Sequence, residues 1–246
     1  MDGIESQHQA MGYDRTATLF SPEGRLLQVE YAEKTVRLGS ASMGIVCSDG
    51  VAIVADKRIS DPLLIPESAM KIYEIDDHII ASTAGILSDS RILMEKAQNV
   101  AQQNRIVYDE PIDVESVIRE IANLKQAYTQ YGGVRPFGLK VIMAGVQNNK
   151  ACKVFTSDVT GNYFGVRATA IGENDDKILE LLRKEYKDNL TLEKGVKLAL
   201  SIFKKVLGKT FDITKFESCI VEKDTMKIKR LVGAQLAQFA KFSEKE

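Results

Sequence analysis

The sequence lacks tryptophan and has only three cysteines, two histidines and five prolines in 246 residues. Cys47, Cys152 and Cys219 are widely spaced, odd in number and set in apolar runs, which predicts buried free thiols rather than disulfides or a metal site. His8 and His78 are isolated from each other and from the three cysteines in the sequence. We therefore expect no metal and no other cofactor.

An excess of one charge and a long hydrophobic run are also missing. The formal net charge is -1, which gives no reason to expect a nucleic acid or an anionic membrane as partner. No stretch approaches the ~18 consecutive apolar residues of a membrane-spanning helix, and the N-terminus does not pair a basic region with an apolar one. With 44% apolar and 27% charged residues, the composition is that of an ordinary soluble globular protein, and we expect it in the cytoplasm.

The first forty residues contain a polar leader and then a helix. Residues 1–12 have nothing to bury, so we expect a flexible segment, with residues 13–246 forming a single domain. Ser21 can cap a helix with its hydroxyl, and Pro22 suits the first helical position. Apolar residues at spacings of three and four then predict a helix over residues 22–38, ended by Gly39.

The rest of the chain alternates between grouped strands and grouped helices. Alternating or apolar runs separated by turn residues predict strands, and apolar residues at helical spacing predict helices. The expected strands are 42–47, 51–55, 71–75, 79–83, 139–146, 152–156, one within 161–171, 216–222 and 226–231. The expected helices are 88–108, 114–131, 174–186, 191–207 and a short one through Leu236 and Phe239.

This order predicts an α+β fold. Two groups of strands and two of helices favour a four-layer αββα sandwich, in which two antiparallel sheets lie between helix layers and the N-terminal helix is an addition. No internal linker is rich enough in proline, glycine and serine to divide the chain.

Several longer motifs are distributed along the chain. They are Tyr13-Asp14-Arg15, Phe20-Ser21-Pro22-Glu23-Gly24-Arg25-Leu26, Gln28-Val29-Glu30-Tyr31-Ala32, Tyr128 through Gly138 and Ala168-Thr169-Ala170-Ile171-Gly172. Together they closely resemble the α-subunit of the archaeal-type proteasome core particle. The resemblance covers about residues 12 to 232.

The resemblance implies the four-layer fold of N-terminal-nucleophile hydrolases. It also implies a non-catalytic member of seven-membered rings that stack outside the catalytic β rings. Such a ring needs two different, mutually complementary faces on each chain. The implied partners are other copies of this chain, proteasome β-subunits, the C-terminal tails of activator ATPases, and unfolded protein substrates that enter for degradation.

A rival interpretation is a catalytic threonine-type peptidase chain, because the hairpin near residues 40–58 also resembles the start of the β-subunits. Matched position by position, the nucleophile falls on Ser40, the acidic residue on Asp56 and the lysine on Met70. Ser40 follows a helix rather than a removable propeptide, so it has an amide where a free amine is required, and Met70 carries no charge. We therefore expect no peptidase activity in this chain. A third interpretation is a free-standing scaffold or binding module.

The resemblance also implies two binding sites. Tyr13, Asp14, Pro22 and Tyr31 match the positions that hold the gate over the axial pore open. Without the resemblance, we would expect Tyr31 to pack on its own helix and Tyr13 to be disordered.

Lys71, Gly85, Ile86 and Glu30 match the pocket that receives activator tails, where an ammonium group suits a terminal carboxylate. A lone lysine or glutamate at such positions is otherwise an ordinary solvated charge. Two departures bear on partner choice: Glu33 stands where many relatives have a basic residue, and the loop over residues 59–68 carries two prolines and little charge.

Overall fold

The strands form two five-stranded antiparallel sheets in the computed structural model, which describes residues 12, 16, 18–58, 61 and 63–241. The first sheet has the order β10-β9-β2-β1-β8. Its strands are β1 (Ser42–Cys47), β2 (Gly50–Asp56), β8 (Ala168–Ile171), β9 (Phe216–Glu222) and β10 (Ile228–Val232). The second sheet has the order β3-β4-β5-β6-β7. Its strands are β3 (Ile72–Asp76), β4 (Ile79–Gly85), β5 (Leu139–Val146), β6 (Cys152–Ser157) and β7 (Tyr163–Val166).

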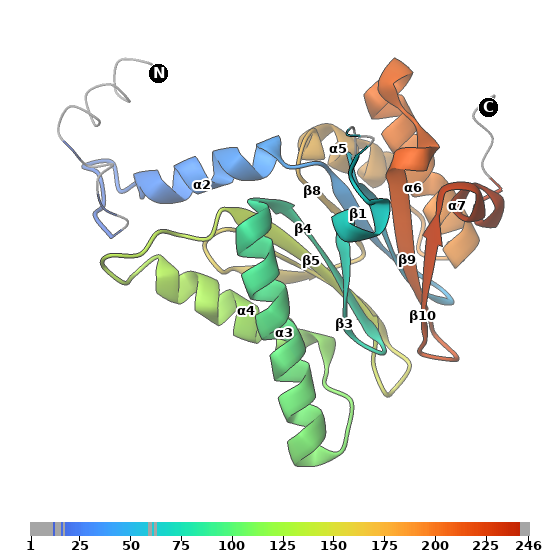
Figure 1. Ribbon diagram of the computed structural model, residues 1–246, viewed down its shortest axis with the longest axis horizontal. Coiled ribbons are helices and arrows are strands. Elements are labelled where there is room, and N and C mark those ends of the chain that lie inside the picture. The colour runs from blue at the N-terminus through green and yellow to red at the C-terminus, as the bar shows by residue number, and fades with distance from the viewer. Residues whose placement is uncertain (1–11, 13–15, 17, 59–60, 62, 242–246) are drawn as a thin grey trace.

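Helices cover the outer face of each sheet (Figure 1). The second sheet is covered by α3 (Leu87–Tyr108) and α4 (Val114–Tyr128), and the first by α5 (Asp175–Glu185), α6 (Leu192–Leu207) and α7 (Gly233–Phe239). The helix α2 (Leu27–Leu38) runs across one end of the sandwich and packs on β4 and β5. Short 3-10 turns lie at Pro66–Ala69, Gly208–Thr210 and Ile213–Lys215. The predicted four-layer αββα fold with an additional N-terminal helix is therefore confirmed.

The core between the sheets explains why several strands are apolar on both faces. Ile53, Ile142 and Cys219 are fully buried between the sheets, whereas Ile45 and Met143 on β1 and β5 face the helix layers. A strand that contacts a sheet on one side and helices on the other has no solvent-facing side, so its sequence does not alternate.

The N-terminal helix begins later than predicted. Ser21 does not cap it: the Ser21 carbonyl accepts from Gly24 N at 2.8 Å, and its hydroxyl accepts from Arg25 N at 3.3 Å. Residues 21–24 thus form a turn, with Pro22 inside it and Gly24 at φ +75°. Proline and glycine suit a β-turn as well as a helix start, and here the turn prevails. The helix begins at Leu27 and ends at Leu38, before Gly39 as predicted.

Most other boundaries lie within one or two residues of the prediction, and two differences are larger. The helix α4 ends at Tyr128 rather than Tyr131, because Thr129, Gln130 and Tyr131 hydrogen-bond to the last helical carbonyls in a tighter turn. The single strand expected within residues 161–171 is two strands. Of these, β7 pairs with β6 and β8 pairs with β1, so the chain crosses from one sheet to the other at Arg167.

Two of the three cysteines are buried as predicted. Burial raises the pKa of the Cys47 and Cys219 thiols to about 12, while Cys152 is only half-buried. Among the described residues, no three metal-ligating side chains group together, and no helix is both long and apolar enough to cross a bilayer.

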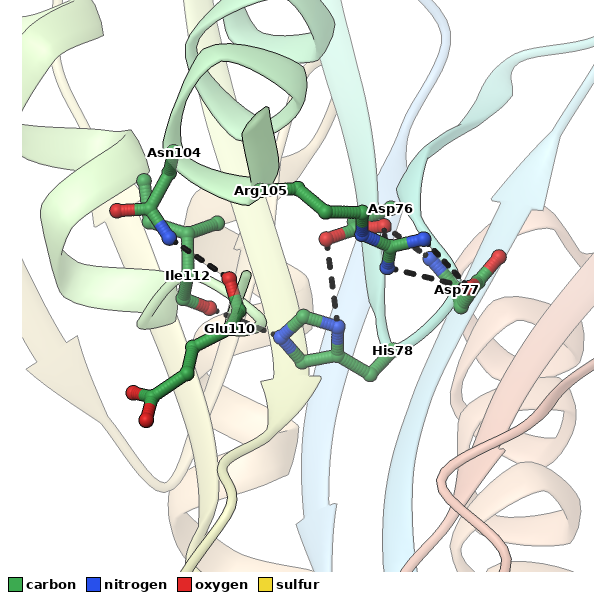
Figure 2. Close-up of polar contacts among 7 residues, drawn as sticks. All are labelled: Asp76, Asp77, His78, Asn104, Arg105, Glu110 and Ile112. Carbon is green, nitrogen blue, oxygen red and sulfur yellow. Dashed lines mark hydrogen bonds and ion pairs between the residues drawn. The ribbon is translucent and has the colours of Figure 1, made fainter. Parts of the chain in front are cut away.

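His78 is not isolated in three dimensions, although it is in the sequence. Its Nε2 lies 2.9 Å from the carbonyl oxygen of Ile112, and because a carbonyl only accepts, Nε2 carries the proton. Its Nδ1 lies 3.7 Å from Asp76 Oδ2, and Arg105 donates to Asp76 Oδ1 at 2.6 Å (Figure 2). This cluster ties the β3–β4 turn to the end of α3 and to the connection before α4. His8 lies outside the described residues.

Candidate functional site

A cleft of about 1000 Å³ opens where α2 passes into β1. Its walls come from the end of α2, the segment that leads from β2 into β3, the end of β4 and the first turns of α3. Lys71 and Gly85, two of the four residues predicted to bind activator tails, line it. Ile86 follows Gly85 directly but is not part of the lining.

Lys71 is a buried lysine in the lining of the cleft. Its side-chain Nζ donates to the carbonyl oxygen of Ser40 and to Ser40 Oγ, the latter at 2.5 Å. Only 8% of Lys71 is exposed. Burial lowers the pKa of the amine to about 7; Asp56 and Glu217 act in the opposite direction, and Arg58 adds to the lowering.

Glu217 holds the backbone at Lys71, and the sequence analysis missed it. Its Oε1 accepts from the backbone nitrogens of Lys71 and Ile72 at 2.6 and 2.8 Å, and its Oε2 accepts from Arg230 at 3.2 Å. Glu217 is fully buried in β9. A carboxylate within an otherwise apolar strand is a signal that could have identified it, because buried carboxylates need charged or amide partners.

The motif from Tyr128 to Gly138 forms the support behind the cleft. Arg135 donates to both carboxylate oxygens of Asp89, at 2.7 and 2.6 Å, and Gly138 N donates to the same side chain at 3.0 Å. Burial works to raise the pKa of Asp89, but the hydrogen bonds from Arg135 and Gly138 outweigh it and hold that pKa below its ordinary value. The Gly138 carbonyl accepts from Ile86 N at 3.0 Å and from the Thr35 hydroxyl at 3.1 Å. The motif therefore joins α2, the end of β4 and the start of α3.

The lysine that lies next to Ser40 is Lys71, the residue after the matched Met70. Lys71 Nζ contacts Ser40, whereas Met70 is 46% exposed. Asp56 is buried at the end of β2, and its Oδ1 accepts from Arg58 N at 2.9 Å. An acid and a lysine thus both lie near Ser40. The missing group is the free amine, because the nitrogen of Ser40 is in a peptide bond with Gly39.

The structure describes two of the four predicted latch residues. Pro22 is exposed in the turn before α2, and Tyr31 is half-buried on α2 with Lys34 Nζ 5.4 Å from its ring centre. Tyr13 and Asp14 lie outside the described residues. The latch therefore stays a prediction.

Glu30 does not line the cleft. It lies in the first turn of α2, at the other end of the helix from Gly39, and accepts from Arg25 Nε at 2.6 Å. Its assignment to the tail-binding pocket stays a prediction, because a single chain does not test a pocket between neighbours.

The cleft is more basic than acidic. Its basic lining residues are Lys57, Arg58, Lys71, Arg91 and Arg230, and its acidic ones are Asp61 and Glu74. Such a lining attracts anions, and the amine and the backbone around Gly85 provide a place for a carboxylate.

Comparisons with known proteins agree with this geometry. The family model described as "Proteasome subunit" matches residues 36–221, and the model for the N-terminal signature of the A-type proteasome subunits matches residues 13–34. A proteasome alpha subunit from Methanothermobacter thermautotrophicus is 43% identical over 91% of this chain and 90% of its own length. Proteasome alpha subunits from Methanocaldococcus jannaschii and Thermococcus sibiricus are 46% and 39% identical, over 78% and 96% of this chain and 74% and 89% of their own lengths. The sandwich, the α-type N-terminal segment and these relatives together show that the chain belongs to the proteasome α-subunit family.

Proposed function

We propose that this chain is a non-catalytic member of a heptameric outer ring of the proteasome core particle. In this role it templates assembly with β-subunits in the cytoplasm, gates the entry of unfolded proteins and docks regulatory ATPases.

The observation that carries the non-catalytic role is the link between α2 and β1. The helix ends at Leu38, and the chain passes through Gly39 into Ser40 and β1 without a break. An N-terminal nucleophile uses its own free amine as the base. Ser40 has no such amine, although Asp56 and Lys71 lie close to it.

The docking role is supported by the cleft. A buried amine, a net basic lining and a glycine at φ +133° at its edge suit the terminal carboxylate and backbone of an extended tail. In a ring, the neighbouring chain would complete this pocket.

The gating role is supported by the exposed position of Pro22 in the turn before α2 and by the partial exposure of Tyr31 on α2. A polar leader that precedes them costs little to rearrange and suits an order–disorder switch.

The experiment is to measure native mass and peptide hydrolysis of the full chain, alone and mixed with a proteasome β-subunit. We expect sevenfold species of the chain, no hydrolysis by the chain alone, and hydrolysis once the β-subunit is added. Hydrolysis by the chain alone would contradict the non-catalytic role. A persistent monomer that binds no β-subunit would instead favour the free-standing scaffold.

A further inference from the structure

The hydrogen bonds of Lys71 suit a neutral amine. Both acceptors of its Nζ belong to Ser40, namely the carbonyl oxygen and Oγ. Within the part of the chain that the structure describes, no carboxylate forms an ion pair with this amine. An ammonium group has three N–H donors, whereas a neutral amine has two donors and a lone pair. In the neutral form, Ser40 accepts from both N–H donors, and the lone pair is directed away from Ser40.

Burial favours the same protonation state. Lys71 is almost fully buried, and burial, with Arg58 acting in the same direction, lowers its pKa to about 7 against the opposing effect of Asp56 and Glu217. A desolvated lysine of this kind is a nucleophile near neutral pH. A solvated lysine with the ordinary pKa of about 10.4 is neutral in only about one molecule in 2500 at pH 7.

Lys71 is 8% exposed, and both it and Ser40, which accepts the hydrogen bonds of its amine, line the cleft. Lys57, Arg58 and Arg91 line the same cleft, but Arg58 pairs with Glu173 and Arg91 with Glu95, so Lys57 is the cation of these three that can attract a small anion. Lys57 has no ion-pair partner among the described residues, so its charge is available to an anion at the cleft.

We propose that Lys71 is an acylation site, whose amine takes the acyl group from small acyl phosphates that enter the cleft. The lone pair of Nζ attacks the carbonyl carbon of the acyl phosphate, and a nitrogen–carbon bond forms. The bond between that carbon and the phosphate oxygen breaks, with its electron pair passing to the phosphate. One N–H proton passes to the departing phosphate, so the products are an amide on Lys71 and hydrogen phosphate.

Acylation would remove the basic amine that Ser40 holds at this position. If Lys71 is the partner of an activator's terminal carboxylate, the modified chain would no longer dock that activator. This consequence rests on the proposed function, whereas the modification itself does not.

The chain contains a matched control for access. Lys125 is also buried, with its Nζ 3.2 Å from Ser157 Oγ and 3.3 Å from the Ser157 carbonyl oxygen, and its pKa is also lowered to about 7 by burial. Lys125 is fully enclosed between α4 and β6 and does not line the cleft. A difference in the rate of acylation between Lys71 and Lys125 therefore reports access from the cleft.

The test is to incubate the folded full chain with acetyl phosphate at pH 7.0 and at pH 9.5, and to follow acetylation of each lysine by peptide mass spectrometry. At pH 7.0 we expect Lys71 to react at least about tenfold faster than the exposed Lys209, and Lys125 to remain unmodified. The advantage of Lys71 should shrink at pH 9.5, where exposed amines also become neutral. The Lys71→Met variant, checked for folding by circular dichroism, should lose the fast reaction and keep the slow ones.

Three results would overturn the proposal. The first is acetylation of Lys71 no faster than that of Lys209 at pH 7.0. The second is equal modification of Lys71 and Lys125, which would show that the cleft gives no special access. The third is an acetyl group on Ser40, recognised as an ester because hydroxylamine removes it. Since these readouts need no activator, failure of tail docking and failure of the acylation proposal are distinguishable.

Discussion

Gly39 and Gly85 meet backbone to backbone, with no room for a side chain between them. A Cβ on Gly39 would collide with the backbone nitrogen of Gly85 and would lie 3.2 Å from the carbonyl carbon of Ala84. This contact seats the end of α2 on the end of β4, and both glycines line the cleft. The sequence predicted Gly39 as a helix terminator, but its φ of -72° is open to any residue, so the close approach is what requires glycine.

Gly39→Ala should therefore destabilise the fold or displace α2. Overpacking of this kind costs roughly 1–3 kcal/mol of the free energy of unfolding, measured by urea denaturation. Gly132→Ala is the matched control, because a Cβ there meets nothing within 4 Å and its φ is not positive. Equal stability of the two variants would show that the two backbones can move apart at no cost.

Lys125→Met should stabilise the protein at neutral pH. Lys125 is fully buried, and its pKa falls from 10.5 to about 7 on folding. Between these two values the unfolded chain binds more protons than the folded one, so the stability of the wild type rises with pH over that range. Replacing a buried ionisable group by an apolar one of similar size gains roughly 1–3 kcal/mol.

The gain should shrink as the pH rises from 7 towards 10, where lysine is neutral in both states. Urea denaturation of both proteins at several pH values measures this. Lys209→Met, at an exposed position, should change the free energy of unfolding by less than about 0.5 kcal/mol. A gain that stayed constant over this pH range would mean that protonation of Lys125 is not its origin.

Arg105→Met should destabilise the cluster around His78. The Asp76 side chain is 2% exposed, and Arg105 is the cation that donates to it. The Oδ2 atom of Asp76 has no hydrogen-bond partner in the described part of the chain. Removing Arg105 leaves this carboxylate uncompensated, at a cost of about 1–3 kcal/mol, since Arg105 itself is partly exposed.

Arg91→Met on the same helix is the control. Arg91 forms an ion pair with Glu95, but both side chains are well exposed, so little stability should be lost. Thermal denaturation of both variants tests the difference. Similar melting temperatures would show that the pairing of Asp76 with Arg105 contributes little to stability.

Lys71→Ala should leave ring assembly intact and abolish stimulation of peptide hydrolysis by an activator. The amine is the group that would bind the terminal carboxylate of the activator tail. Met70→Ala is the control, because Met70 lines the same cleft without charge. Peptide hydrolysis by the assembled particle, with and without activator, is the measurement, and unchanged stimulation in Lys71→Ala would remove the tail-binding assignment.

Deletion of residues 1–12 should raise the basal entry of long peptides into the assembled particle. The leader is expected to obstruct the axial pore, so its loss should increase hydrolysis of a long peptide several-fold. A tripeptide substrate is the control, because a small molecule is hindered less. If the long peptide were hydrolysed no faster, the leader would not be the gate.

The local pattern of the sequence was sufficient to predict most helices and strands and the order of the layers. Strands such as β1 and β5 have the predicted ends, because their apolar runs stop at polar turn residues. The motifs within residues 13–32 and 128–138 indicated the family from the sequence alone. The resemblance to the family also predicted Lys71 and Gly85 as tail-binding residues, and both line the cleft.

Tertiary contacts decided what those residues do. The contact between Lys71 and Ser40, and the support of Lys71 by Glu217 from a strand 146 residues away, depend on sheet pairing and on the meeting of two sheets. The division of residues 161–171 between two sheets has the same origin. The sequence alone thus determined the elements, the layers and the family, since these follow from local periodicity and motifs. Only the folded chain decided which side chains share the cleft and with what charge, because burial and pairing are set by residues far apart in the sequence.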